Sequence, residues 1–238
     1  MIGAVADIHS PKGLLDFIRA LNNAPKDKIK LLILAGDVIF KGRVEGLKGV
    51  CEALKSKLKQ VPTIAVFGNE EYDEVKDKLL KACDVIRWVD DNLLVTKVED
   101  KNVVIIGSRG CLDEPTSWQA KNIPNIKEIY RERARKIGEL LRKAKSLGGL
   151  VILVTHYPPT YRTLEGEPRR VWPQMACKAL EKYIVEYKPN IVIHGHAHNS
   201  KVYEVTIGST RVYNVSLPAT KKITIIDIKP VGLERFLF

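Results

Sequence analysis

The sequence has few of the residues that mark a disulfide scaffold or a zinc-binding module. Its 238 residues include only four cysteines, Cys51, Cys83, Cys111 and Cys177, and no two of them form a CxxC pair. A zinc ribbon and a thioredoxin-type motif are therefore excluded. Because the thiols are widely spaced and no secretory leader is visible, we predict that all four are reduced and serve packing in a cytoplasmic protein.

Long hydrophobic runs are also missing. No apolar stretch approaches the ~20 residues that a helix needs to cross a bilayer. The apolar residues 2–6 lead directly into Asp7, without a basic segment before them or a cleavage site after them. We therefore expect neither a secretory leader nor a membrane partner. The composition is that of an ordinary globular chain, and its length predicts a single domain over residues 1–238.

Acidic residues are too few to balance the basic ones. Lysine and arginine number 39 against 28 aspartates and glutamates, which gives a formal net charge of +11. Such an excess attracts anionic partners, including phosphate esters and nucleic acid. The alternative is a solvated, lysine-rich surface, since many basic residues alternate with glutamate, as in residues 128–145. The charge permits a phosphate-containing substrate without requiring one.

Apolar, β-branched runs alternate with amphipathic stretches along most of the chain. Continuous hydrophobicity is typical of strands that are covered on both faces, and this order predicts an α/β fold with helices outside. The expected strands are residues 2–6, 30–35, 63–67, 102–107, 150–155 and 190–195. The expected helices are residues 11–21, 44–58, 71–82, 125–144 and 173–186.

After residue 200 the hydrophobic pattern alternates with a period of two. Residues 201–207, 209–216 and 221–228 are therefore expected to form half-exposed antiparallel strands. A further hairpin is expected over residues 85–98. Residues 108–124 and 157–172 fit no element, and both exceed the ~12–15 residues beyond which an irregular loop is usually functional or disordered. We predict that these two loops form walls of a site.

Side chains of the metal-binding type follow the ends of five predicted strands. Ligands in open α/β sheets bind beyond the carboxyl ends of the strands, so we expect these side chains to meet at one rim. Their nitrogen and oxygen atoms suit divalent manganese, iron, zinc or nickel. Seven ligands are too many for one such ion and fit two ions ~3.5–4 Å apart. In chain order they are Asp7, His9, Asp37, Asn69, His156, His196 and His198.

Each motif is weak when taken alone. An aspartate and a histidine after a strand often cap a turn, and Gly68-Asn69 also suits a turn with positive φ. Two histidines separated by one residue, as in His196 and His198, seldom serve packing. All the motifs in order, each at a strand end, are hard to explain by chance. His194 differs because it lies within an apolar run, and we assign it to the core.

The ordered set Asp-x-His, Gly-Asp, Gly-Asn, His and Gly-His-x-His resembles the calcineurin-like metallophosphoesterase family over residues 5–199. The resemblance implies a four-layer α/β/β/α sandwich with two mixed β-sheets, which agrees with the β-rich C-terminal segment. It also implies two metal ions, with manganese as the expected choice in vitro. The first ion would be held by Asp7, His9 and His198, the second by Asn69, His156 and His196, and Asp37 would bridge them.

The third motif departs from the family pattern, which usually reads Gly-Asn-His followed by an acid. Here Asn69 is followed by Glu70 and Glu71, so the histidine usually credited with aiding the leaving group is missing. A carboxylate at Glu70 would repel a dianionic monoester more than a monoanionic diester, which predicts a preference for diesters. Glu70 could act as a general acid only if burial raised its pKa. The alternative is that it points to solvent and takes no part.

A second departure lies after Asp37. Phosphoprotein phosphatases of the family tend to carry aspartate and arginine where Phe40 and Lys41 stand, which argues against a protein phosphatase. The predicted reaction is hydrolysis of a small phosphate ester or nucleotide by a metal-bridging hydroxide. Catalytic roles are predicted for Asp37, Asn69, Glu70 and His156. Phosphate contacts are predicted for arginines of the two long loops, which are Arg109, Arg162, Arg169 and Arg170.

Two other functions stay open. One is a non-catalytic scaffold, similar to relatives that resemble a retromer subunit without the active-site histidine. The other is a nuclease, which the basic charge permits, although no basic motif interleaved with aromatics and no appended nucleic-acid domain is visible. The sequence does not indicate an oligomeric state.

Overall fold

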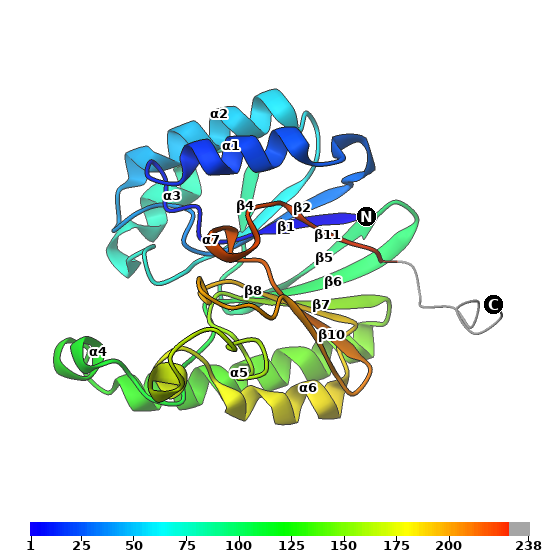
Figure 1. Ribbon diagram of the computed structural model, residues 1–238. Coiled ribbons are helices and arrows are strands. Elements are labelled where there is room, and N and C mark those ends of the chain that lie inside the picture. Colours follow the sequence, from blue (N-terminus) through cyan, green and yellow to red (C-terminus); the bar gives the residue numbers. More distant parts are fainter. Residues whose placement is uncertain (229–238) are drawn as a thin grey trace.

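The computed structural model describes residues 1–228 and contains two β-sheets between two layers of helices (Figure 1). The expected four-layer α/β/β/α arrangement is confirmed. The first sheet consists, in spatial order, of β11 (Thr224–Ile226), β1 (Ile2–Val5), β2 (Leu31–Ala35), β3 (Thr63–Val66) and β4 (Ile86–Trp88). The second consists of β5 (Asn92–Val98), β6 (Lys101–Ser108), β7 (Leu150–Thr155), β8 (Ile191–His194), β10 (Thr210–Asn214) and β9 (Glu204–Ile207).

Both sheets are mixed. Strands β1 to β4 run parallel and β11 joins β1 antiparallel. In the second sheet β6, β7, β8 and β10 run parallel, while β5 and β9 are antiparallel edge strands. The six strands expected from continuous apolar runs are all present, because each lies where both of its faces are covered. Their carboxyl ends deliver the metal-type side chains.

Three apolar layers hold the four structural layers together. The first lies between the first sheet and α1 (Leu14–Asn23), α2 (Leu47–Lys57) and α3 (Lys76–Ala82). The second lies between the two sheets and includes Ile33 and Ile105. The third lies between the second sheet and α5 (Ile126–Leu147) and α6 (Glu181–Tyr187), where Ile137 and Ile184 are fully buried. A short helix, α4 (Ser117–Asn122), projects from one end (Figure 1).

Several elements differ from the expectation. Strand β10 was expected to be half-exposed and antiparallel, but it is mostly buried and pairs parallel with β8. Helix α4 lies within residues 108–124, which were expected to fit no element. Residues 85–98 do not form a hairpin, since β4 pairs with β3 in the first sheet and β5 with β6 in the second. The expected helix over residues 173–186 is wrong in its first half. A 3-10 helix, Arg169–Gln174, contains Pro173 and ends one residue after it, and α6 begins only at Glu181. The N–H of Cys177 donates to the carbonyl of Pro158 at 2.9 Å, so this residue is bonded to a loop and not to a preceding helical turn.

The prediction of four reduced thiols is wrong. Cys51 on α2 and Cys83, directly after α3, form a disulfide with a Cα–Cα distance of 5.8 Å. The two residues are 32 positions apart in the sequence, and only the packing of α2 beside α3 brings them together. Cys111 and Cys177 are free and buried, as expected. The cytoplasmic location stays a prediction, and within residues 1–228 no helix has both the length and the apolar character to cross a membrane.

Replacing both Cys51 and Cys83 with alanine is expected to destabilise the fold. A cross-link that closes a loop of this length restricts the unfolded chain and is worth about 3–4 kcal/mol on the chain-entropy model. Thermal unfolding of the wild type and the double variant, each with and without a thiol reductant, measures the effect. The variant should melt lower than the oxidised wild type and should not respond to the reductant. An unchanged melting temperature on reduction of the wild type would contradict a stabilising disulfide.

Candidate metal centre

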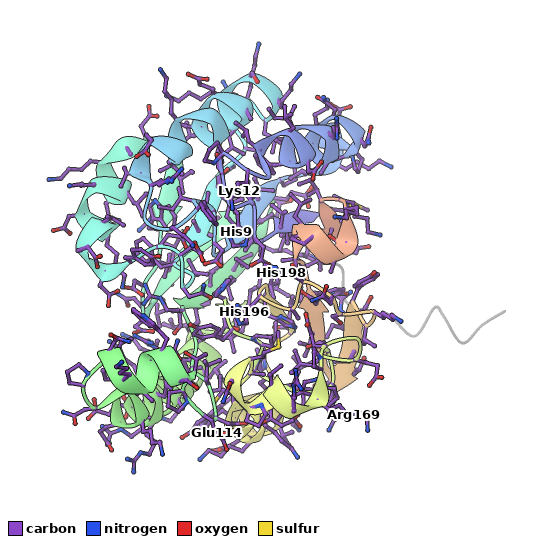
Figure 2. All side chains as sticks on the ribbon, turned by 60° about the vertical axis from the view of Figure 1, so that its left-hand side comes forward. His9, Lys12, Glu114, Arg169, His196 and His198 are labelled. Atoms are coloured by element: carbon purple, nitrogen blue, oxygen red, sulfur yellow. A yellow bond between two sulfur atoms is a disulfide. The ribbon has the colours of Figure 1, made fainter. Side chains whose placement is uncertain are left out.

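The loops after β1, β2, β3, β7 and β8 bring the seven predicted ligands to one rim. Nitrogen and oxygen atoms of Asp7, His9 and His198 lie within 4.8 Å of one another. A second group with the same spacing consists of Asp37, His156 and His196. Asn69 joins the second group, with its Oδ1 2.9 Å from Nε2 of His156. Figure 2 shows His9, His196 and His198 close together between the two helical layers.

Asp37 lies between the two groups. Its Oδ2 atom is 3.8 Å from Nε2 of His9 and 3.5 Å from Nε2 of His156. Its Oδ1 atom accepts a hydrogen bond from the backbone N–H of Glu70 at 2.8 Å. One oxygen of the carboxylate is therefore fixed by the backbone, while the other faces a histidine of each group.

The backbone of the ligand loops adopts a left-handed conformation at four ligand positions. The φ angles are 59° at Asp7, 47° at His9, 50° at Asp37 and 69° at His196. Residues other than glycine rarely adopt such angles, which cluster where the surrounding structure imposes them. Here hydrogen bonds between loops impose them. The N–H of Asp7 donates to Gly36, that of His9 to Asp37, and that of His196 to Oδ2 of Asp7.

Two glycines are required by the close approach of these loops. A Cβ atom at Gly68 would lie 2.2 Å from Oδ1 of Asp37 and 2.4 Å from its backbone nitrogen. A Cβ atom at Gly36, where φ is +86°, would lie 2.6 Å from Nδ1 of His156. The glycines of the Gly-Asp and Gly-Asn motifs thus let two ligand loops pack directly against each other.

Burial holds three of the four imidazoles in the neutral form that metal ions require. At His198 burial is outweighed by the hydrogen bond with Asp7, which raises the pKa of that imidazole. Burial lowers the pKa of His156 to about 4, and it also lowers the pKa values of His9 and His196. Nδ1 of His156 lies 3.1 Å from the carbonyl of Ala35 and must donate to it, because a carbonyl only accepts. Nε2 then carries a lone pair that faces Oδ1 of Asn69. Two facing lone pairs are stabilised by a cation between them, so this pair fits a metal ion.

The buried carboxylates also fit cations. Asp7 and Asp37 are fully buried, and among the described residues only histidines form ion pairs with them. Burial, followed by the nearby charges of Glu71 and Asp7, raises the pKa of Asp37 well above its usual range. Burial opposes ionisation of Asp7 as well, but its hydrogen bond with His198 and the nearby His156 lower its pKa overall. Buried carboxylates without lysine or arginine partners are typical of metal sites.

Glu70 lies at the edge of this arrangement. A carboxylate oxygen of Glu70 lies within 4.8 Å of ligand atoms of His9 and Asp37. Its Oε2 accepts a hydrogen bond of 2.5 Å from the backbone N–H of Lys41. The side chain therefore points toward the ligands rather than away from them. Its role as a general acid stays a prediction.

Glu71 is the residue that the sequence reasoning missed. Its side chain is fully buried, and its carboxylate accepts hydrogen bonds from the backbone N–H groups of Asp37, Gly68 and Ile39 at 2.9, 2.6 and 2.9 Å. Burial, against these three bonds, raises its pKa to about 6. Glu71 thus ties the Asp37 loop to the Asn69 loop. An acid directly after a strand-end motif is the available signal. The sequence pattern predicts a helix from residue 71, but the structure begins a 3-10 turn only at Asp73 and α3 at Lys76.

His194 is confirmed as a core residue. It is fully buried, with Nε2 2.9 Å from the hydroxyl of Thr163.

The four predicted phosphate-binding arginines are not joined to the ligands. No hydrogen bond or ion pair within residues 1–228 links them to the seven side chains. Arg109 donates to the carbonyl of Glu71 and pairs with Asp73, while Arg162 pairs with Glu181. Arg169 pairs with Glu165 and lies apart from the labelled histidines in Figure 2, and Arg170 is exposed. Their phosphate contacts stay predictions.

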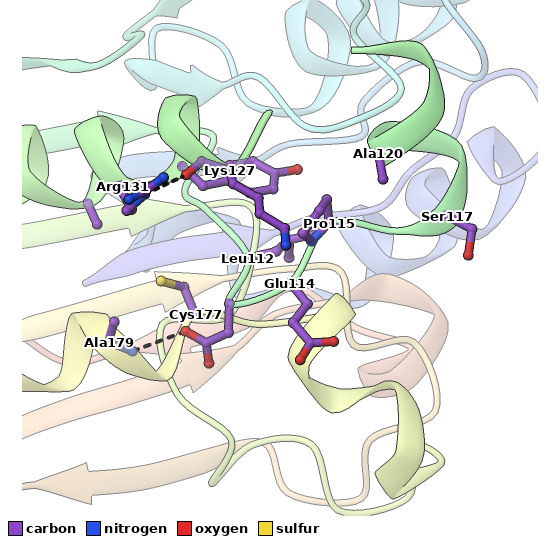
Figure 3. A pocket seen from close by; sticks show the side chains of 12 residues that line it. Leu112, Glu114, Pro115, Ser117, Ala120, Lys127, Arg131, Cys177 and Ala179 are labelled. Atoms are coloured by element: carbon purple, nitrogen blue, oxygen red, sulfur yellow. Dashed lines mark hydrogen bonds between the residues drawn. The ribbon is translucent and has the colours of Figure 1, made fainter. Parts of the chain in front are cut away.

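A separate pocket lies between α4, α5 and the segment before α6 (Figure 3). Its volume is about 560 Å³, and none of the seven ligands lines it. Glu114, Lys127, Tyr130, Arg131 and Cys177 are among its lining residues. Part of its wall comes from the 108–124 loop, so that loop borders this pocket.

The fold and this rim define a metallophosphoesterase, and comparison with known proteins agrees. The chain belongs to the calcineurin-like phosphoesterase family, whose model matches residues 1–200. No curated protein matches the chain.

Several solved structures share the fold. Phosphopantetheinyl hydrolase (PptH) from Mycobacterium tuberculosis superposes with a TM-score of 0.67 at 15% identity, over 97% of this chain and 98% of that one. A dimetal phosphatase from Danio rerio superposes with a TM-score of 0.58 at 11% sequence identity, over 90% of this chain and 86% of that one. GAP50, the anchor in the inner membrane complex of Plasmodium, superposes with a TM-score of 0.56 at 14% sequence identity, over 97% of this chain and 76% of that one. At these identities the likeness concerns the fold alone.

Proposed function

We propose that this chain is a dinuclear metal-dependent phosphoesterase that favours phosphodiesters over phosphomonoesters. The observation that carries the proposal is the position of Asp37, whose Oδ2 lies between His9 of one ligand group and His156 of the other. Asp7, His9 and His198 would hold one divalent ion, and Asn69, His156 and His196 the other, with Asp37 shared. When bound, two such ions activate water and neutralise the phosphate oxygens. We also propose that the chain is a single domain.

The residues of the chain would then position the groups around the phosphate. The carbonyl of Ala35 fixes the tautomer of His156, so its Nε2 stays available as a ligand. The backbone N–H of Glu70 holds Oδ1 of Asp37 and thereby orients Oδ2. Small phosphate esters and nucleotides are the proposed substrates, with manganese the proposed ion in vitro.

The position of Glu70 supports the preference for diesters. A carboxylate near His9 and Asp37 repels the second negative charge that a monoester carries and a diester lacks. Unit charges about 4 Å apart interact with ~4 kcal/mol near a protein surface. We expect solvent to reduce this effect, which leaves a preference of about tenfold, or ~1.4 kcal/mol.

The test compares hydrolysis of nitrophenyl phosphate and bis-nitrophenyl phosphate by the Mn²⁺-loaded protein. We expect a higher kcat/KM for the diester, and Glu70→His should shift the ratio toward the monoester. Glu114→Gln, at the separate pocket, is the matched control and should leave the ratio unchanged. A clear monoester preference in the wild type would refute the diesterase proposal.

A scaffold is the second candidate, favoured by the glutamate at position 70 in place of the family histidine. After manganese loading, a scaffold that has lost its metal centre would contain less than one ion per chain, whereas the proposed enzyme would contain two. Metal analysis of the purified protein separates the two candidates. A nuclease would be indicated by salt-sensitive cleavage of single-stranded DNA.

A further inference from the structure

Three cations surround one aromatic ring beside the proposed metal centre. Phe40 packs edge-on against His9, with ring centroids 6.4 Å apart. Nζ of Lys12 lies 3.7 Å from the centroid of the Phe40 ring, Nζ of Lys41 lies 5.3 Å away, and Cζ of Arg43 lies 5.9 Å away. All three basic residues are exposed. We call Lys12, Lys41 and Arg43 the cationic rim.

The cationic rim lacks anionic partners within the part of the chain that the structure describes. None of its three side chains makes an ion pair or a hydrogen bond with residues 1–228. The carboxylate of Glu70 accepts from the backbone N–H of Lys41 and not from its ammonium group. The ring attracts each cation by only ~0.5–1 kcal/mol at an exposed position. Mutual repulsion of the cations opposes this attraction. An anion placed among them would relieve the repulsion.

The position of the rim is fixed relative to the ligands. The N–H of Lys12 donates to the carbonyl of His9 at 2.9 Å, and the N–H of Phe40 donates to that of Ser10 at 3.0 Å. The rim and the metal ligands therefore belong to the same two loops. Figure 2 shows Lys12 next to His9, while Arg169 lies apart.

We propose that the cationic rim binds a second phosphate group of the substrate. The preferred substrates would then be phosphodiesters that carry another phosphate beside the scissile one, such as phosphorylated nucleotide diesters. Lys12 covers one face of Phe40, so that face is not free to stack a base. Lysine and arginine supply the donors that phosphate oxygens accept. This inference rests on the proposed function of the same site.

The first test uses two dinucleotides with the same scissile bond. Dithymidine phosphate and its 5′-phosphorylated form are incubated with the Mn²⁺-loaded protein, and only cleavage of the internucleotide bond is scored. The wild type should favour the phosphorylated form by about tenfold in kcat/KM, mainly through KM. Lys12→Glu with Arg43→Glu should reduce this ratio to about one or invert it. Lys136→Glu reverses an exposed charge on α5 and serves as the control, which should show the same ratio as the wild type.

The second test measures binding without catalysis. Inorganic pyrophosphate is titrated calorimetrically into EDTA-treated protein at low salt, where screening of surface charge is weak. Lys12→Glu with Arg43→Glu should weaken binding at least tenfold, the neutral Lys12→Met less so, and Lys136→Glu should bind like the wild type. Equal affinity in the rim variants and the wild type would overturn the inference.

The two tests separate the two possible failures. If neither dinucleotide is cleaved but the rim variants still lose pyrophosphate binding, the proposed function fails and the anion site stands. If both dinucleotides are cleaved at equal rates and pyrophosphate binding does not depend on the rim, the anion site fails and the phosphodiesterase stands.

Discussion

Asp37→Asn is expected to abolish metal-dependent hydrolysis of bis-nitrophenyl phosphate. Oδ2 of Asp37 lies 3.8 Å from Nε2 of His9 in one ligand group and 3.5 Å from Nε2 of His156 in the other. An amide at this position removes the negative charge that two neighbouring cations would share. Replacing a residue that only supports a metal ligand typically lowers metal affinity or activity by 10–100-fold. A shared ligand should cost more, so we expect a loss of at least ~100-fold in kcat/KM and a fall from two ions per chain to one or none.

The same substitution should have the opposite effect on the metal-free protein. Burial and the neighbouring Glu71 and Asp7 disfavour the charged form of Asp37, as its raised pKa indicates. Asparagine keeps an oxygen for the N–H of Glu70 and can donate to Nε2 of His156. In EDTA the variant should therefore melt higher than the wild type, by the equivalent of ~1–2 kcal/mol.

Metal analysis and thermal unfolding with EDTA and with Mn²⁺ check both effects. Asp113→Asn is the matched control because this carboxylate accepts from Tyr161 and Lys178, away from the ligands. It should keep both the metal content and the stabilisation by Mn²⁺. An Asp37→Asn protein with two ions and the wild-type rate would contradict the assignment of Asp37 as the shared ligand.

The rim of ligands could be predicted because its signal is local in the sequence. A strand covered on both faces is a short continuous apolar run, and the polar residue after it marks its carboxyl end. Asp37 after residues 30–35 and His156 after residues 150–155 show this pattern. The parallel order of the strands then places these ends on one edge of the sheets. No long-range information was needed for that step.

Features that depend on which elements become neighbours could not be predicted. Residues 85–98 were expected to pair as a hairpin, and nothing in their sequence indicates that β4 and β5 join different sheets. The spacing of Cys51 and Cys83 in the sequence does not indicate that the elements carrying them pack together and allow the disulfide to form. Arg109 was expected to contact substrate, yet its guanidinium donates to the carbonyl of Glu71, 38 positions away.

Glu71→Ala is expected to have the largest effect on the stability of the metal-free protein. Its carboxylate accepts three hydrogen bonds from the backbone N–H groups of Asp37, Gly68 and Ile39, and none of its surface is exposed. Alanine leaves these three groups buried without an acceptor. Each unsatisfied group costs about 1–3 kcal/mol, so a total loss of roughly 3–9 kcal/mol is expected for the three groups. Chemical denaturation in EDTA measures this loss directly.

Glu71→Gln separates the effect of the missing acceptors from that of the missing charge. Oε2 of Glu71 accepts two of the three bonds, so an amide oxygen in its place keeps both, while the amide nitrogen faces the N–H of Ile39. The glutamine variant should therefore lie between alanine and the wild type. Glu70→Ala is the neighbouring control, because it loses only one bond, to the N–H of Lys41.

The effect of Glu71 on metal binding should follow from its effect on the two loops. Once the Asp37 loop and the Gly68 loop are no longer tied together, Asp37 and Asn69 lose their fixed separation. Metal affinity should then fall in the order wild type, Glu71→Gln, Glu71→Ala, and excess Mn²⁺ should restore part of the activity, because the ligands themselves remain. Equal metal affinity in all three proteins would show that the ligand loops keep their geometry without this carboxylate, and Glu71 would then stabilise the fold without positioning the metal centre.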